Sequence, residues 1–139
     1  MFKFTWSEEY SVGIPSIDEQ HKDFFNLANK IIDVLNSDKI SKKELSPLIK
    51  KLYEHGFEHF ATEEKYFDTY QYNLTNLHVD AHNWYRKKVK YFSRRLLDPS
   101  VDLKVLADEI ATYSIYWLSD HILIMDKKYT KFFQEKGIK

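Results

Sequence analysis

A histidine and a glutamate one helical turn apart constrain the fold of this chain more than any other feature. His59 and Glu63 continue a row of apolar positions that recur every three or four residues, which is the spacing of one face of an α-helix. That row comprises Leu45, Ile49, Leu52, Gly56, His59, Glu63, Tyr66 and Tyr70. A carboxylate inside a protein core is costly unless it is hydrogen-bonded, paired with a charge or bound to a metal. The fold must therefore bring partners to Glu63 from other segments.

The same spacing recurs along most of the chain and predicts helices at about residues 17–36, 42–70, 76–97 and 101–133. The chain of 139 residues has only three glycines and three prolines, which favours long helices. Helices joined by short connections pack as antiparallel neighbours. The prediction is therefore an all-α fold, an up-down-up-down four-helix bundle in one domain over residues 1–139. Residues 1–15 are expected to form an extended arm that lays its apolar side chains on the bundle.

Short polar motifs predict where the helices begin. Segments 16–19 and 41–44 both read Ser-x-x-Glu, the pattern of a capping box, in which the two side chains satisfy free amides of the first turn. Asn73 or Thr75 is expected to cap the third helix, and Ser100 the fourth.

The last predicted helix changes phase after His121. His121 and Asp126 are five residues apart, so on a regular helix they would lie about 140° from each other. One inserted residue, a π-bulge between them, would bring both side chains to the core side. We therefore expect a π-bulge in this segment.

The amino-acid composition argues against nucleic acids and membranes as binding partners. Lysine and arginine together number 21, as do aspartate and glutamate, so no net charge attracts nucleic acid or an acidic membrane surface. No apolar run approaches the roughly 18 residues of a membrane span. The absence of cysteine excludes thiolate metal sites and is compatible with a reducing compartment. A cytoplasmic protein without nucleic-acid or membrane partners is expected.

Seven metal-binding side chains fall on inward-facing stripes of the predicted helices, or can be brought there. They are His21, His59, Glu63, His78, His82, His121 and Asp126. Alternating helix directions place the starts of the first and third helices level with the ends of the other two. A single inward histidine is more often a hydrogen-bonded core residue than a ligand, but five histidines and two carboxylates at one height point to one metal cluster.

His55 differs from the other histidines. Gly56 occupies the stripe position beside it, so His55 is expected at the edge of the core and outside the ligand set. Whether it tunes the site is left open.

The number and type of donors indicate the metal. Seven donors exceed what one ion takes, so two ions are expected. Imidazole and carboxylate donors without thiolate suit iron, zinc, copper or nickel. Zinc prefers four ligands, and iron is the better fit for this set. If each carboxylate bridges and an oxide or hydroxide joins the ions, one position remains open for a small molecule. The chain lacks the Glu-x-x-His set of ferritin-like oxygenases on its stripes, which favours reversible oxygen binding over oxidation.

Four stretches carry a family resemblance: residues 6–21, His59-x-x-x-Glu63-Glu, His78-x-x-x-His82, and residues 117–129 with His121 and Asp126. Together they closely resemble the bacterial hemerythrins over nearly the whole chain. The resemblance implies a non-haem centre of two iron ions, joined by an oxo or hydroxo bridge, that binds dioxygen at one iron as hydroperoxide. It further implies this division of ligands: His78, His82 and His121 on one iron, His21 and His59 on the iron with the open position, and Glu63 and Asp126 bridging.

The function expected from this resemblance is reversible dioxygen binding for storage, delivery or scavenging, without enzymatic activity. An enzyme that reduces nitric oxide or peroxide, an iron-repair protein, and an oxygen or redox sensor acting through a separate protein partner are the alternatives. A dry pocket would be needed to release oxygen unchanged. Its wall is expected from Phe24, Phe25, Phe60, Trp117 and Ile122.

Overall fold

Four long helices form the body of the protein in a computed structural model that describes residues 1–139. They are α1 (Pro15–Leu35), α2 (Lys42–Tyr70), α3 (Thr75–Leu97) and α4 (Leu103–Asp120). A π-helical turn η2 (His121–Met125), a 3-10 turn η3 (Asp126–Tyr129) and α5 (Thr130–Glu135) continue α4, and a short 3-10 turn η1 (Glu8–Tyr10) lies in the arm. The predicted all-α four-helix bundle is confirmed.

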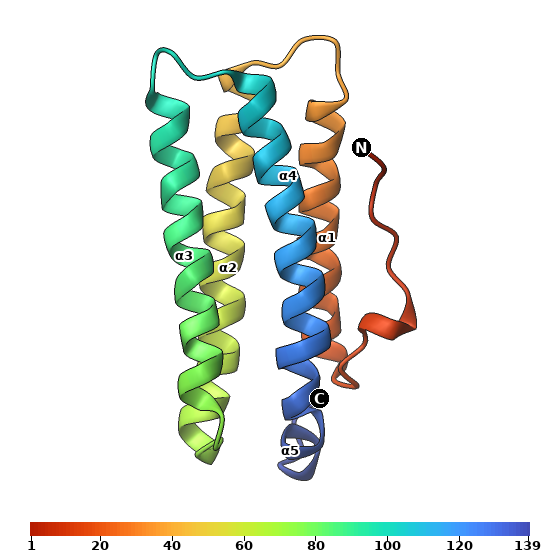
Figure 1. The fold of residues 1–139 in the computed structure, drawn as a ribbon. Helices are drawn as coiled ribbons and strands as arrows, with labels where there is room; N and C mark the ends of the chain where they lie inside the picture. Colours follow the sequence, from red (N-terminus) through yellow and green to blue (C-terminus); the bar gives the residue numbers. More distant parts are fainter.

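Successive helices of the bundle run in opposite directions (Figure 1). α1 packs against α2 and α4, and α3 packs against the same two helices from the other side. The starts of α1 and α3 therefore lie at the same end of the bundle as the ends of α2 and α4 (Figure 1). No helix is long and apolar enough to cross a membrane.

The N-terminal arm runs along α1, as predicted (Figure 1). Its Phe4 ring stacks on Phe25 of α1 with the ring centroids 3.6 Å apart. Asn29 of α1 fixes the arm by accepting from the Phe4 amide at 2.7 Å and donating to the Phe4 carbonyl at 2.9 Å. Val12 and Ile14, at the end of the arm, are buried in the core.

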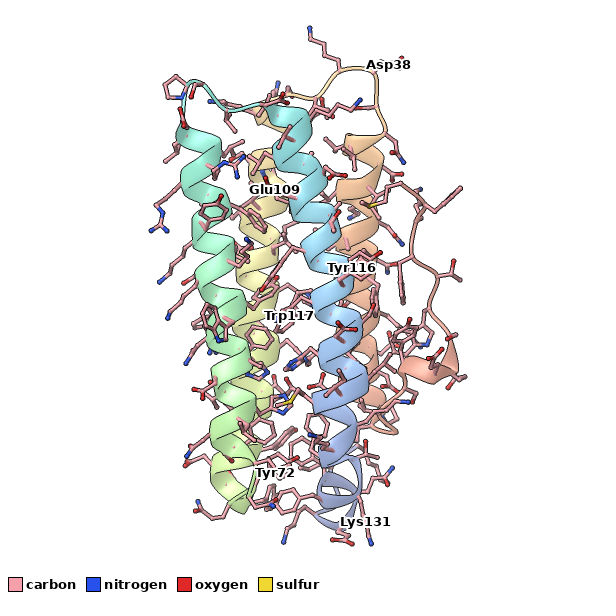
Figure 2. All side chains as sticks on the ribbon, viewed as in Figure 1. Asp38, Tyr72, Glu109, Tyr116, Trp117 and Lys131 are labelled. Carbon is pink, nitrogen blue, oxygen red and sulfur yellow. The ribbon has the colours of Figure 1, made fainter.

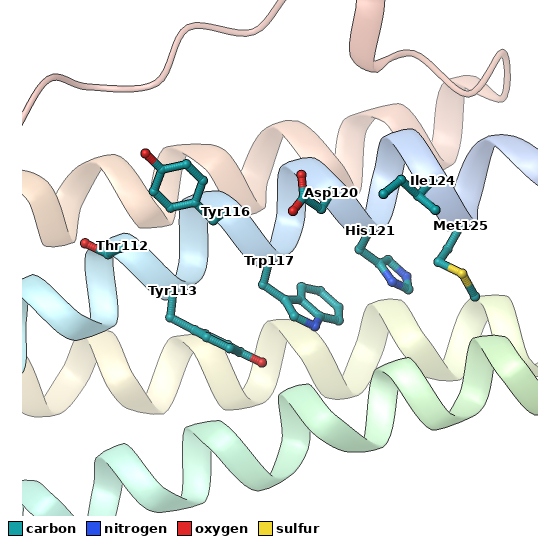
Figure 3. Close-up of a pocket in the computed structure, with 8 residues that line it drawn as sticks. All are labelled: Thr112, Tyr113, Tyr116, Trp117, Asp120, His121, Ile124 and Met125. Carbon is teal, nitrogen blue, oxygen red and sulfur yellow. The ribbon is translucent and has the colours of Figure 1, made fainter.

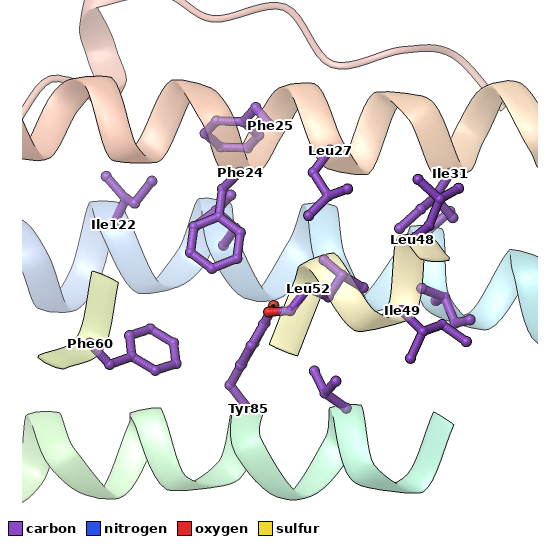
Figure 4. Packing of buried hydrophobic residues seen from close by; sticks show 14 of the residues in the cluster. Phe24, Phe25, Leu27, Ile31, Leu48, Ile49, Leu52, Phe60, Tyr85 and Ile122 are labelled. Atoms are coloured by element: carbon purple, nitrogen blue, oxygen red, sulfur yellow. Dashed lines mark hydrogen bonds between the residues drawn. The ribbon is translucent and has the colours of Figure 1, made fainter. Parts of the chain in front are cut away.

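A close approach of α2 and α3 depends on Gly56. A β-carbon added there would lie 2.7 Å from a ring carbon of Tyr85, which is closer than atoms can pack. Tyr85 crosses to α2 and donates its hydroxyl hydrogen to the Leu52 carbonyl at 2.9 Å. Figure 4 shows Tyr85 and Leu52 together in the packed interior, close to Phe24 and Phe60.

Of the two predicted capping boxes, one is present only in its serine half and the other is absent. The Ser41 hydroxyl accepts from the Glu44 amide at 3.2 Å at the start of α2, which confirms the serine cap. The prediction at Ser16 is wrong, because α1 already begins at Pro15. Proline suits a first helical position, since its φ is preset and it has no amide hydrogen to satisfy.

The predicted caps of α3 and α4 are also wrong. Thr75 is the first residue of α3 rather than its cap, and its hydroxyl donates to the Tyr72 carbonyl at 2.5 Å. α4 begins at Leu103 instead of residue 101, because the Asp102 carboxylate accepts from the amides of Lys104 and Val105. Ser100 instead donates to Asp98 in the preceding turn.

The predicted π-bulge is confirmed, but the expectation of one continuous helix to residue 133 is wrong. The Asp126 amide donates to the carbonyl of His121, five residues earlier, and the π turn passes into the 3-10 turn η3. The wider turn rotates the following residues, and both His121 and Asp126 are buried.

Candidate metal centre

All seven of the predicted metal-binding side chains meet at the end of the bundle where α1 and α3 begin, which we call the cluster end. None of the seven is more than 5% exposed. α1 contributes His21, α2 contributes His59 and Glu63, α3 contributes His78 and His82, and the η2 and η3 turns contribute His121 and Asp126. The residues selected from their spacing in the sequence therefore lie together in the folded protein.

The donor atoms form two groups that share one carboxylate. In one group a donor atom from each of Glu63, His78, His82 and His121 lies within 4.8 Å of the others. In the second group the same holds for His21, His59, Glu63 and Asp126. We call these the three-histidine half and the two-histidine half.

Each carboxylate reaches both halves. Glu63 Oε1 lies 3.1 Å from His59 Nε2 and 3.2 Å from His82 Nε2. Asp126 Oδ1 lies 2.8 Å from His78 Nε2 and 2.9 Å from His121 Nε2, and its Oδ2 lies 3.0 Å from His21 Nε2. Glu63 and Asp126 therefore each lie between histidines of the two halves.

These close approaches are not hydrogen bonds for most of the donors. The following buried atoms lack a hydrogen-bond partner of acceptable geometry: Nε2 of His78, His82 and His121, both Glu63 oxygens and both Asp126 oxygens. Unpartnered buried polar atoms are rare in folded proteins because each one costs free energy. Two donors bound to one ion at about 2.1 Å and at a right angle to each other are about 3 Å apart. The cluster therefore fits a metal site.

Burial and mutual charge set the ionisation of these groups. Burial and the Asp126 charge disfavour ionised Glu63, but His59 and His82 outweigh them and hold the pKa of Glu63 well below its usual range. Burial likewise opposes ionised Asp126, but its histidine neighbours, His121 foremost, hold its pKa well below the usual value. Burial lowers the pKa of His21 and favours the neutral ring. Burial opposes the charged form of His59, but the Glu63 charge outweighs it and raises the pKa of His59. Metals bind neutral imidazoles and ionised carboxylates, so a metal at His59 would displace a proton.

Two histidines are also held through their outer nitrogens. His59 Nδ1 lies 2.6 Å from the Gln20 side-chain oxygen, and His82 Nδ1 lies 2.7 Å from Glu64 Oε2. Neither Gln20 nor Glu64 was predicted from the sequence as a partner of a cluster histidine. Each one is adjacent in sequence to a cluster residue, but only the orientation of the imidazole rings reveals the contact.

Aromatic rings surround the cluster. Phe60 stacks on His82 with centroids 3.9 Å apart, and Trp117 stacks on His121 at 4.5 Å. Phe24 lies edge-on to His59 at 5.9 Å. These contacts agree with the expected wall, but Phe25 faces the arm instead, because its ring is stacked on Phe4.

Two further aromatic residues of this wall were not predicted from the sequence. Phe67 and Tyr129 both contact His78, with ring centroids 4.7 and 5.6 Å away. Ile122, which was expected in the wall, is buried in the π turn.

The cluster is nearest to solvent at His121. A surface depression of about 380 Å³ on α4 and η2 is lined by Trp117, His121, Ile124 and Met125 among others. Figure 3 shows Trp117 and His121 on the same side of the helix, one turn apart. Trp117 also stands between α3 and α4 in the view of the whole molecule (Figure 2).

His55 lies outside both groups of donor atoms, as expected. It is half-buried, and its Nε2 donates to the Gln20 main-chain carbonyl at 3.0 Å. His55 therefore contacts the residue that also holds the His59 ring.

The fold is a four-helix bundle, and its buried cluster of imidazoles and carboxylates fits a metal site. The family model described as the hemerythrin HHE cation binding domain matches residues 12–133. The chain therefore belongs to the hemerythrin family, and the donor cluster is consistent with iron.

Relatives from different organisms match over most of the chain. A bacteriohemerythrin of Clostridium acetobutylicum is 30% identical over 128 residues, which cover 91% of this chain and 98% of the relative. A bacteriohemerythrin of Stenotrophomonas maltophilia is 25% identical over 93% of this chain and 80% of its own length. A hemerythrin-like protein of Naegleria gruberi is 26% identical over 91% of this chain and 90% of its own length.

Proposed function

We propose that this protein binds dioxygen reversibly at a centre of two iron ions, and that it acts as an oxygen store, carrier or scavenger rather than as an enzyme. The observation that carries the proposal is the pair of donor groups joined by Glu63, with buried donor atoms that lack hydrogen-bond partners. The names of the relatives, bacteriohemerythrin and hemerythrin-like protein, support it. A cytoplasmic location stays a prediction.

The two halves suggest a division of the ligands. His78, His82 and His121 would hold one ion, His21 and His59 would hold the other, and Glu63 and Asp126 would belong to both. The two-histidine half supplies one imidazole fewer, so the open position is proposed there. Iron suits a set of imidazole and carboxylate donors without thiolate.

The iron would supply the position at which dioxygen coordinates and the electrons that its binding requires. The surrounding side chains would keep that position dry. Phe60 and Trp117 cover the outer faces of two imidazoles in the three-histidine half, and Phe24 borders His59. Exclusion of water favours the release of oxygen as oxygen, because water and protons promote irreversible oxidation.

Reversibility is the property to test. The iron-loaded protein should be reduced without air, exposed to air and then evacuated, while its visible absorption is followed. A band that appears in air and disappears under vacuum through repeated cycles would support the proposal. Rapid, irreversible oxidation on the first exposure would contradict it and would favour a reductase that consumes nitric oxide or peroxide.

A further inference from the structure

The two halves of the cluster differ in the group that holds a histidine from outside. In the two-histidine half the partner of His59 Nδ1 is the side-chain amide of Gln20, at 2.6 Å. In the three-histidine half the partner of His82 Nδ1 is the carboxylate of Glu64, at 2.7 Å. The two contacts are equally short, but one acceptor is neutral and the other is an acid.

Glu64 is paired with a cation. Arg86 Nη2 donates to the same Oε2 atom at 2.9 Å, so this oxygen accepts from both His82 and Arg86. A carboxylate that accepts the Nδ1 hydrogen increases the electron density at Nε2, the nitrogen that faces the cluster.

Gln20 is fixed to α2 at two points. Its side-chain oxygen accepts from His59, and its main-chain carbonyl accepts from His55 Nε2 at 3.0 Å. The His55 ring is held in turn by an edge-on contact with Phe24, with centroids 4.4 Å apart. His55 therefore positions Gln20, and Gln20 positions the His59 ring.

We propose that Gln20 and Glu64 are positioning residues that make the two halves unequal metal binders. Both direct Nε2 of their histidine towards the cluster by accepting the hydrogen on Nδ1. The neutral amide leaves His59 the weaker donor, and the carboxylate makes His82 the stronger one. The two-histidine half thus holds its ion less tightly, with a higher reduction potential. The inference rests on the proposed two-ion centre, and it gives His55 a role through Gln20.

Equilibrium titration of the metal-free protein with Co²⁺ against a competing chelator tests this inference. The unmodified protein should bind two ions with unequal affinities. Gln20→Met keeps the side-chain length but removes the acceptor, and should weaken the second ion by roughly 10- to 100-fold while the first is unchanged. Gln20→Glu should tighten the second ion and lower the reduction potential of the iron-loaded protein. Glu64→Gln should instead weaken the first ion.

A charge control and a coupling control separate positioning from general effects. Ser16 is exposed one turn before Gln20, so Ser16→Glu adds a charge to the same helix without the contact to His59, and should leave both affinities unchanged. His55→Leu should weaken the second ion less than Gln20→Met does. It should add nothing in the Gln20→Met background, because both changes act through one contact.

The outcomes distinguish the inference from the proposed function. If the unmodified protein binds fewer than two ions, the two-ion centre fails, and the inference fails with it. If it binds two ions, but neither Gln20→Met nor Gln20→Glu changes the second affinity or the reduction potential, the inference alone is overturned. If Gln20→Met does not fold, the near-isosteric Gln20→Glu still tests whether Gln20 sets the affinity of the second ion. Its tighter second ion would support the inference, and an unchanged one would overturn it.

Discussion

The two ends of the bundle are built from the same four helices but are held together by different means. The end opposite the cluster, the apolar end, is filled by side chains such as Leu45, Ile49, Leu96, Leu106 and Ile110, all at most 7% exposed. The cluster end places seven polar side chains at the same depth. Figure 2 labels Asp38 at the apolar end of the bundle and Tyr72 at the cluster end.

This difference shows which part of the fold depends on a ligand. Apolar side chains at the apolar end are stabilised simply by leaving water. At the cluster end the buried donors gain free energy only from a charge partner, a proton or a metal. Stability of the apolar end should therefore be independent of metal, and that of the cluster end should be linked to it.

Asp126→Ala should have the largest effect. Its two oxygens reach His78, His121 and His21, so its loss should reduce the iron content from two ions to fewer than one per chain. Iron analysis after anaerobic loading measures this. Asp108→Ala removes an exposed carboxylate from α4 and is the matched control, which should keep both ions. Full loading of the Asp126 variant would refute the bridging role.

Leu106→Ala tests the apolar end. Leu106 is fully buried near the start of α4, so the truncation should lower the free energy of unfolding by about 2–5 kcal/mol. Urea unfolding gives the free energy, and iron analysis should still find two ions per chain. If the variant folded but lost its iron, the two ends would not be independent.

Acid should weaken the metal-free protein through the cluster end. The pKa values of Glu63 and Asp126 lie well below their usual range in the folded protein, chiefly because histidines outweigh burial and the repulsion between the two carboxylates. Their stabilisation is complete above the ordinary carboxyl pKa of about 4 and is lost as the pH falls from there through the depressed values. Urea unfolding at successive pH values should show this loss, and Leu106→Ala should show the same pH dependence. A free energy of unfolding that rises in acid would contradict the assignment.

Ser41→Ala should have the smallest effect. The Ser41 hydroxyl accepts from the Glu44 amide at the start of α2, and losing a helix cap costs about 1 kcal/mol. Thermal or urea unfolding can measure this, and Ser46→Ala, which changes an exposed serine inside the same helix, should cost less. An equal loss of stability in both variants would show that the Ser41 hydroxyl does not stabilise the start of α2.

The spacing of apolar residues along the sequence was enough to predict which face of each helix is buried. The stripe that contains His59 and Glu63 was enough to place both in the core, and the five-residue step from His121 to Asp126 was enough to expect the π turn. Helix starts were harder to predict, because several polar residues near each start compete for the same amides. Asp102 caps α4 although Ser100 lies two residues earlier.

Spacing identified only some of the side chains around the cluster. Gln20 and Glu64 reach imidazole nitrogens on neighbouring helices, and that depends on how two helices are rotated against each other. Phe25 and Phe24 are adjacent in sequence, but the first faces the arm and the second faces His59. Consecutive residues of a helix point in different directions, so one of them can contact the core while the next contacts the arm. The spacing of apolar residues does not show which contact each one makes unless the neighbouring element is known.

Anomalous diffraction at the iron absorption edge, from crystals of the iron-loaded protein, would locate the metal ions relative to the seven side chains. We expect two peaks of anomalous scattering at the cluster end. One should lie beside His78, His82 and His121 and the other beside His21 and His59, with Glu63 and Asp126 contacting both. A single peak, or peaks away from these side chains, would contradict the account.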